Sequence, residues 1–275
     1  MHTLPQQQQK EQQVHQTQQQ QQEENQEMET EQQENEEMET EQYETIEQPQ
    51  QQQQPLSKGE SLVPLEPCSS MMVSGATGSG KSRWVFRLLQ NLHGMYVKEP
   101  PVETLYCYGI HQPLFDEMES KLPNFTLHLG LPTPAELEEY TRDGRHRLII
   151  LDDLQQSVIK SDEMELLFTQ GCHHRRLSVI FIAQNLIPQG KNSRNIALNT
   201  WYLVLLKNLR DANQIAYLGR QIFPGKKNYL TEAYSDSMKI QGYLMIDLSP
   251  HADDKLRVRT RVFPNEDPVI YLPKS

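Results

Sequence analysis

A glycine-rich run at residues 75–82 has the residue types and the spacing needed to hold phosphate groups. Its sequence, GATGSGKS, fits the pattern G-x-x-x-x-G-K-[ST]. In this pattern the glycines let backbone N–H groups approach phosphate oxygens, the lysine reaches the β- and γ-phosphates, and the last hydroxyl binds Mg²⁺. The sequence therefore predicts a site for ATP and Mg²⁺. The predicted ATP-binding residues are Gly75, Ala76, Thr77, Gly78, Ser79, Gly80, Lys81 and Ser82.

Two neighbouring carboxylates follow a short apolar run at residues 148–151. An apolar run of this length is typical of a buried parallel strand, and its carboxyl end should face the nucleotide. We expect Asp152 to hold Mg²⁺ together with Ser82, and Asp153 to orient or deprotonate the attacking water as a catalytic residue. The alternative is a polar pair of Asp residues in an ordinary turn.

A glutamine follows a strongly apolar run, residues 177–183. If this strand lies beside the one that ends at Asp152, Gln184 falls where a side chain can sense the γ-phosphate. An amide suits that catalytic role, because it donates to a phosphate oxygen and accepts from water without adding negative charge. The alternative is an amide that only satisfies nearby backbone groups.

A basic cluster, His-His-Arg-Arg at residues 173–176, precedes the same strand. Arg175 or Arg176 is therefore a catalytic candidate that would reach the γ-phosphate of a neighbouring subunit as an arginine finger. The alternative is a set of cations that complement the dipole at the end of a helix. Arg194 and Arg210 are reserve candidates for the finger.

The elements that must position these residues alternate along the chain from about residue 65. Apolar runs of strand length alternate with amphipathic stretches, which predicts one α/β domain over residues 61–275 with a mostly parallel sheet flanked by helices. The predicted strands are 71–74, 103–108, 125–129, 148–153, 177–183 and 201–206, with a terminal hairpin of 242–247 and 256–263. The predicted helices are 81–92, 113–122, 133–140, 162–174 and 211–223, and those at Thr133 and Asp162 begin with capping signals.

The first 60 residues differ sharply in composition from the rest. They consist largely of Gln and Glu and offer almost no apolar residues for a core, so we expect a disordered, solvated tail. A coiled coil is the alternative, but sustained a and d apolar positions are absent. The tail contains 14 Glu, no Asp and two Lys, a charge of −12, so the whole-chain charge of −11 leaves +1 for residues 61–275. The acidic balance therefore does not exclude a nucleic-acid partner for the domain.

Cysteine usage and hydropathy predict the compartment. Three cysteines, without C-x-x-C spacing, indicate a reducing intracellular protein. No apolar run reaches the ~20 residues of a membrane span, so we expect no membrane association.

The motifs together resemble those of the FtsK/HerA class of ATPases. More closely, they are similar to the genome-packaging ATPases of poxvirus-type, adenovirus-like and Polinton (Maverick) elements. The resemblance covers about residues 66–250 and excludes the tail. It is carried by residues 75–82, 148–153, 181–185 and 205–211.

The resemblance implies a RecA-like P-loop fold and a ring-forming ATPase, expected to be a homohexamer, that translocates double-stranded DNA into a capsid. It assigns phosphate and Mg²⁺ to Lys81 and Ser82, Mg²⁺ to Asp152, and the catalytic acid to Asp153, where many relatives of the wider class have Glu. Gln184 matches the strand-end glutamine, and Arg175 or Arg176 matches an arginine before that strand. Double-stranded DNA and capsid proteins are the implied partners, and the nucleus, a virus factory or the virion are the implied locations.

Three other classes of protein share the phosphate loop. A GTPase would carry an Asn/Thr-Lys-x-Asp element after a late strand, and residues 207–211 have the wrong order. A small-molecule kinase would transfer phosphate to a substrate under a lid, and a second ordered carboxylate would be less necessary. A nucleotide-binding interaction module would bind without appreciable turnover, and the intact set of Lys81, Asp152, Asp153 and Gln184 argues against it.

Overall fold

The computed structural model describes residues 59–168, 172, 175–186 and 192–274. The chain divides into two units, Met1–Pro55 and Leu56–Ser275, and the fold described here belongs to the second. Residues 1–58 of the predicted Gln/Glu-rich tail lie outside the described residues, as do His173 and His174 of the basic cluster.

The strands form one sheet that is mostly parallel. Over the described residues its nine strands have the order β3-β2-β4-β5-β1-β6-β7-β8-β9. The pairs from β3 to β6 are parallel, and β7, β8 and β9 continue the sheet antiparallel to their neighbours. This confirms the predicted α/β fold. The strands are β1 (Ser70–Ser74), β2 (Thr104–Tyr108), β3 (Phe125–Leu129), β4 (Arg147–Asp152), β5 (Leu177–Ala183), β6 (Tyr202–Leu206), β7 (Tyr243–Asp247), β8 (Val258–Thr260) and β9 (Val269–Ile270).

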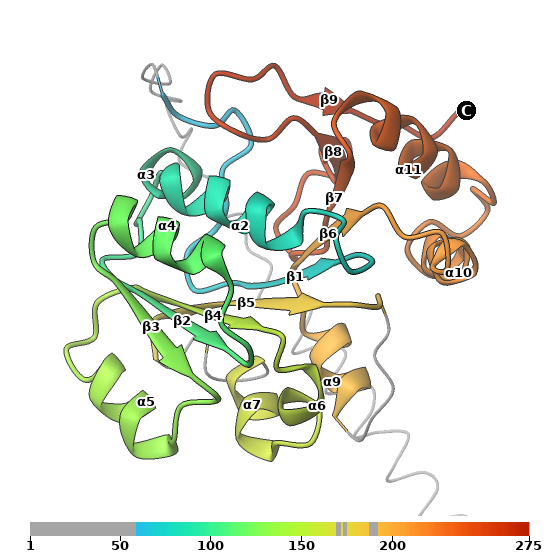
Figure 1. Ribbon diagram of the computed structural model, residues 1–275. Coiled ribbons are helices and arrows are strands. Elements are labelled where there is room, and N and C mark those ends of the chain that lie inside the picture. The colour runs from blue at the N-terminus through green and yellow to red at the C-terminus, as the bar shows by residue number, and fades with distance from the viewer. Residues whose placement is uncertain (1–58, 169–171, 173–174, 187–191, 275) are drawn as a thin grey trace, which may run out of the picture. The chain divides into compact units, whose positions relative to one another are not determined.

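Helices cover both faces of the sheet. Figure 1 shows α2, α3 and α4 on one face and α5, α6, α7 and α9 on the other. The helices are α2 (Lys81–Gln90), α3 (Leu92–Met95), α4 (Pro113–Lys121), α5 (Pro134–Thr141), α6 (Gln155–Val158), α7 (Asp162–Leu166), α9 (Ser193–Leu198), α10 (Ala212–Ile222) and α11 (Tyr229–Ile240). Within the described ranges, none of them is long and apolar enough to cross a bilayer.

The central strands are buried because both of their faces are covered. All five residues of β1 are buried, and their side chains alternate between two cores: Met71 and Val73 pack on the α2 side and Met72 on the opposite side. A strand buried on both faces reads as a continuous apolar run, which is why residues 177–183 were predicted with the bounds that β5 has.

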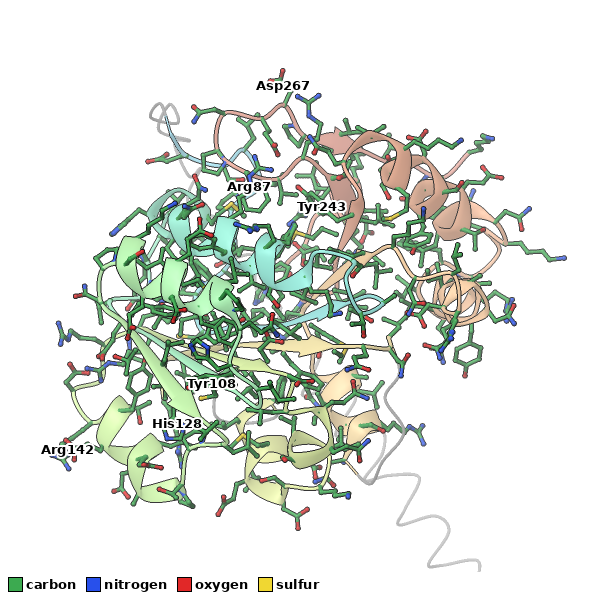
Figure 2. All side chains as sticks on the ribbon, viewed as in Figure 1. Arg87, Tyr108, His128, Arg142, Tyr243 and Asp267 are labelled. Carbon is green, nitrogen blue, oxygen red and sulfur yellow. The ribbon has the colours of Figure 1, made fainter. Side chains whose placement is uncertain are left out.

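The antiparallel part of the sheet, at β7 and the segment after β8, packs against α2 through aromatic side chains. Figure 2 shows Arg87 and Tyr243 on the α2 side of the sheet. The Tyr243 ring lies 5.7 Å from that of Trp84, and the Arg87 guanidinium lies 4.0 Å over the ring of Phe263. The helix that follows the phosphate loop is therefore packed against β7 and the segment after β8.

The capping signals were right for one helix and wrong by one residue for another. In α5 the Thr133 hydroxyl accepts from the Glu136 amide while the Glu136 carboxylate accepts from the Thr133 amide, as predicted. In α7 the N-cap is Ser161, whose hydroxyl accepts from the Met164 amide at 3.2 Å, and not Asp162. Serine and aspartate are equally good caps, so the sequence does not separate them.

Two elements near the C-terminus differ from the prediction. The predicted hairpin exists as β7 and β8, but β8 ends at Thr260 because Arg261 has a left-handed φ of 58°. Helix α11 was not predicted. It packs against α10 where Gly219 meets Leu230: a Cβ on Gly219 would lie 2.9 Å from the Leu230 Cβ.

Candidate active site

The carboxyl ends of four neighbouring strands bring most of the predicted site residues together. Strands β4, β5, β1 and β6 are adjacent and parallel, and Figure 1 shows the arrows of β1 and β5 pointing to the same edge of the sheet. The phosphate loop follows β1, Asp152 ends β4, and Gln184 follows β5. The predicted neighbourhood of Asp152 and Gln184 is therefore present in the fold, because β4 pairs with β5.

The phosphate loop has a backbone that only glycines allow at three positions. Gly78 and Gly80 have left-handed φ values of 77° and 95°. Gly75 is crowded instead: a Cβ there would lie 2.6 Å from the Ser79 Oγ and 2.9 Å from the Leu206 Cβ. The glycine spacing of the motif is thus explained by the path of the loop between β1 and the N-terminus of α2.

The loop carries donors that suit an anionic ligand. Among the described residues, the amides of Thr77, Gly78 and Gly80 donate no hydrogen bond within the chain. The Ser79 Oγ is buried and has no hydrogen-bond partner among the described residues. Buried polar atoms are normally hydrogen-bonded, so this atom is available to a ligand. The loop opens directly into α2, whose N-terminal amides favour negative charge. These groups fit the phosphates of a nucleotide.

Lys81 lies over the loop. Its Nζ donates to the carbonyl oxygens of Gly75 at 2.8 Å and Ala76 at 3.0 Å. Burial lowers the pKa of Lys81, while the nearby carboxylates of Asp152 and Asp153 oppose this shift. The two carboxylates therefore favour the protonated ammonium, which is the form that binds phosphate oxygens.

Ser82 and Asp152 form the oxygen pair expected of a Mg²⁺ site. The Ser82 hydroxyl donates to the Asp152 Oδ2 at 2.8 Å, and the Tyr106 hydroxyl donates to the same oxygen at 2.6 Å. Burial raises the pKa of Asp152, and the hydrogen bonds from Tyr106 and Ser82 oppose this rise. A hydroxyl and a carboxylate at the mouth of a phosphate loop are ligands that Mg²⁺ prefers, so these residues fit the ion.

Tyr106 is a site residue that sequence reasoning missed. It is fully buried in β2, inside a strand that was predicted only from its apolar character. Its role depends on β2 being the neighbour of β4, with Tyr106 opposite Ile150. Strand order is not written in the local sequence, so no signal in residues 103–108 pointed to Asp152.

Asp153 sits in a strained turn that β2 supports. It is exposed and has a left-handed φ of 55°, a conformation that Asp and Asn tolerate better than other residues. The Gly109 amide donates to the Asp152 carbonyl at 3.1 Å, and a Cβ on Gly109 would lie 2.6 Å from the Asp153 carbonyl oxygen. The end of β2 therefore fixes the backbone from which the Asp153 carboxylate projects.

Gln184 is held by its backbone, and its side chain is exposed. The backbone amide of Gln184 donates to the Gln155 Oε1 at 3.0 Å, and its backbone carbonyl accepts from the Asn208 Nδ2 at 3.3 Å. Gln155 begins α6 shortly after Asp153, and Asn208 follows β6. Sequence reasoning assigned no role to Gln155 or Asn208, because both act through contacts between segments that are distant in sequence.

A cavity of about 610 Å³ joins the phosphate loop to the residues after β5 and β6. Its lining includes the loop from Ala76 to Ser79, Gln184, and the segment 207–210 with the reserve candidate Arg210. A larger cavity, of about 980 Å³, lies at the first residues of β2 and β3 and contains no part of the phosphate loop. The chemistry of the lining, and not the volume, identifies the smaller cavity as the candidate nucleotide site.

Arg175 and Arg176 lie at the other end of β5. The seven residues of β5 lie between Arg176 and Gln184 and span about 23 Å at ~3.3 Å per residue, and Arg175 lies one residue further away. Arg176 has a left-handed φ of 50° and is ion-paired with Glu99, and Arg175 is exposed. Within one chain neither arginine reaches the phosphate loop, so a finger role for either requires a second subunit.

Comparison with known proteins gives similar folds only among solved structures. No protein-family model matches the chain, and no curated protein matches it. The DNA-packaging ATPase B204 from Sulfolobus turreted icosahedral virus has a TM-score of 0.45 and 10% identity, over 77% of this chain and 100% of that chain. The genome packaging NTPase B204 from Sulfolobus turreted icosahedral virus 2, in complex with AMPPCP, has a TM-score of 0.43 and 10% identity, over 75% and 98% of the two chains. The candidate site rests on the geometry of this chain alone.

Proposed function

We propose that this chain is a Mg²⁺-dependent ATPase whose turnover drives movement along double-stranded DNA. The observation that carries the ATPase assignment is the 2.8 Å hydrogen bond from the Ser82 hydroxyl to the Asp152 carboxylate at the mouth of the phosphate loop. Asp153 and Gln184 stand at the same edge of the sheet, so groups for binding and for water activation occur together.

The residues divide the work of hydrolysis among them. Lys81 and the loop amides hold the β- and γ-phosphates, and Ser82 and Asp152 would hold Mg²⁺. When bound, Mg²⁺ neutralises charge on the phosphate oxygens. Asp153 takes a proton from water as the water oxygen bonds to the γ-phosphorus and the bond to the bridging oxygen of ADP breaks, which yields ADP and phosphate. The Gln184 amide orients that water.

The DNA substrate is supported by the resemblance of the four motifs to packaging ATPases of the FtsK/HerA class. From the same resemblance we infer a homohexamer. Arg175 or Arg176 of one subunit would complete the site of the next, because neither arginine can reach the phosphate loop of its own chain. Capsid proteins are the further partners that packaging would require, and the nucleus, a virus factory or the virion are the locations where it would occur.

Steady-state ATP hydrolysis, with and without double-stranded DNA, tests the proposal. Lys81→Ala and Asp153→Asn should each lower turnover at least about a hundredfold, because each removes a group that acts on the reacting phosphate or water. Asparagine is the informative replacement at residue 153, since it tolerates the left-handed φ of 55° and keeps the turn.

Matched controls use exposed residues of the same type away from the site. Lys160→Ala and Asp267→Asn should leave turnover unchanged. DNA-stimulated turnover that both site variants lose supports the motor. Turnover that ignores DNA overturns the motor in favour of a kinase or switch, and nucleotide binding without turnover overturns the enzyme in favour of an interaction module.

A further inference from the structure

Basic side chains that form ion pairs and those that do not lie mostly in different parts of the described chain. Before residue 192, most exposed cations of the described chain form ion pairs with carboxylates. These pairs are Arg83–Glu117, Arg87–Glu266, Lys98–Glu66, Lys121–Glu117, Arg142–Glu139, Arg145–Asp143 and Arg176–Glu99. Paired cations have little charge left to offer to a partner.

The segment from residue 192 to residue 228 is different. It contains six Lys and Arg residues and a single acidic residue, Asp211, which is buried. None of the six cations is in an ion pair with a carboxylate of the described residues. The carboxylates nearest to its C-terminal end, Glu232 and Asp236 of α11, are engaged by Lys274 and Tyr271. This segment is therefore the part of the described chain where unpaired cations are concentrated, and Lys160, Arg175, Lys239 and Lys255 are exposed cations outside it.

Helix α10 lies in the middle of this segment and has a fixed outward face. Its inner side packs on α11 through Ile215 and Gly219, the latter against Leu230. The opposite side exposes Asn213, Tyr217, Arg220 and Gln221, and Tyr217 is 50% exposed. Positions spaced by three and four residues share one face of a helix, so these four side chains form one stripe. The stripe contains hydrogen-bond donors and a cation, and no acid.

The same segment is connected to the candidate active site. Asn208 donates to the carbonyl of Gln184, and its own amide donates to the Tyr234 hydroxyl of α11. Lys207 and Arg210 line the nucleotide cavity, and α10 begins two residues after Arg210. Figure 1 shows α10 at the margin of the domain, on the side toward which β1 and β5 point. A displacement of Gln184 on nucleotide binding would therefore be passed directly to the start of α10.

We propose that this surface binds the phosphate backbone of double-stranded DNA and moves with the state of the nucleotide. The α10 surface is defined by Lys207, Arg210, Tyr217, Arg220, Lys226 and Lys227. This inference rests on the proposed function, which identifies double-stranded DNA as the substrate, and it adds the surface to which the DNA binds. The 11 residues of α10 span about 16 Å, which is long enough to cross a groove that is ~12 Å wide. The cations near the two ends of the helix would then lie over the phosphates on either side. Contacts of this kind are independent of DNA sequence, as a translocating motor requires.

Anisotropy of a labelled duplex oligonucleotide, titrated with the full chain in Mg²⁺ and a non-hydrolysable ATP analogue, measures the binding. The triple variant Arg220→Ala, Lys226→Ala, Lys227→Ala removes three charges without touching the nucleotide cavity. Its affinity should fall at least about tenfold, and the slope of log affinity against log salt should become shallower by about two to three. Its ATPase rate without DNA should stay at the wild-type value, and the stimulation by DNA should be lost.

The matched control removes the same charge from other exposed lysines. Lys160→Ala, Lys239→Ala, Lys255→Ala should keep the DNA affinity and salt slope of the wild type. Equal losses in both triple variants, or no loss in the α10 variant, overturn the surface. A wild-type chain that neither binds duplex DNA nor responds to it overturns the proposed function instead. If polyglutamate displaces DNA at an equal charge concentration and loses affinity equally in the α10 variant, the surface serves an acidic protein partner and the DNA assignment is wrong.

Discussion

The burial of Asp152 and its proposed role as a Mg²⁺ ligand favour opposite protonation states of its carboxyl group. Its carboxylate is buried, which raises its pKa, yet a Mg²⁺ ligand must be ionised. The chain compensates with two hydroxyl donors, Tyr106 and Ser82, on the same oxygen. Ser82 is itself a candidate Mg²⁺ ligand, whereas Tyr106 is buried in β2 and donates to the carboxylate from behind the site. We therefore expect Tyr106 to act as a positioning residue for the ion.

Tyr106→Phe should weaken the use of Mg²⁺ more than it weakens the fold. Loss of a partner that orients a metal ligand typically costs about ten- to a hundredfold in metal affinity or activity. The Tyr106 hydrogen bond lowers the pKa of Asp152, so its removal should raise that pKa further. Because the ionised carboxylate is the active form, the acidic limb of the pH–rate profile should move to higher pH. Mg²⁺ titrations of the ATPase rate at several pH values measure both effects.

Tyr140→Phe is the matched control for this prediction. The Tyr140 hydroxyl donates to the carbonyl oxygens of Glu103 and Leu148, away from the carboxyl ends of the strands. Its removal should cost stability of about 1 kcal/mol and leave the Mg²⁺ dependence unchanged. An unchanged pH profile and Mg²⁺ dependence in Tyr106→Phe would show that Tyr106 only fills space in the core.

Among the elements, the end of β2 has a role beyond the sheet, because it supports the turn that carries Asp153. Gly109→Ala would place a Cβ 2.6 Å from the Asp153 carbonyl oxygen, so the turn must move. We expect turnover to fall at least about tenfold, since small displacements of a catalytic group are costly, and stability to fall by ~1–3 kcal/mol. Turnover per folded molecule, with the folded fraction from thermal unfolding, is the measurement.

Gly219→Ala separates crowding from a specific effect on the site. Its Cβ would lie 2.9 Å from the Leu230 Cβ, between α10 and α11, so it should also destabilise the fold by ~1–3 kcal/mol. Its ATPase rate without DNA should remain at the wild-type value per folded molecule. Equal losses of turnover in the two variants would mean that Gly109 acts only through stability.

The elements that the sequence predicted best are those that tertiary contacts alter least. Strand β5 is buried throughout and apolar except for Ser178, so its bounds were predicted correctly. Helix α11 was missed because its fully buried residues are only Leu230, Ala233 and Ser237, while Tyr229, Tyr234 and Met238 are partly buried against the core. The predicted strand 256–263 proved shorter because the left-handed φ of Arg261 ends β8, a backbone choice that no pattern of Arg residues indicates.

For the candidate site as a whole, the motifs predicted the groups that the structure gathers at the phosphate loop but not the residues that support them. Lys81, Ser82 and Asp152 were predicted because phosphate and Mg²⁺ demand particular residue types at particular spacings. Tyr106, Gln155 and Asn208 act through strand order and contacts between distant segments, which local sequence does not encode. The assignment of Arg175 or Arg176 depends on a second subunit and stays a prediction.

The whole assembly is tested by mixing chains with different defects. Arg175 is the better finger candidate, since Arg176 is paired with Glu99 of its own chain. In a head-to-tail ring, an equal mixture of inactive Lys81→Ala and Arg175→Ala chains should recover about a quarter of the wild-type turnover, because a quarter of the interfaces join an intact loop to an intact arginine. A mixture of Lys81→Ala and Asp153→Asn should recover none, because both defects lie in the same chain's site.

Light scattering with ATP analogue and DNA should give the mass of a hexamer. A monomer there would overturn the ring, and no recovery with either Arg175→Ala or Arg176→Ala would overturn both arginines as the finger.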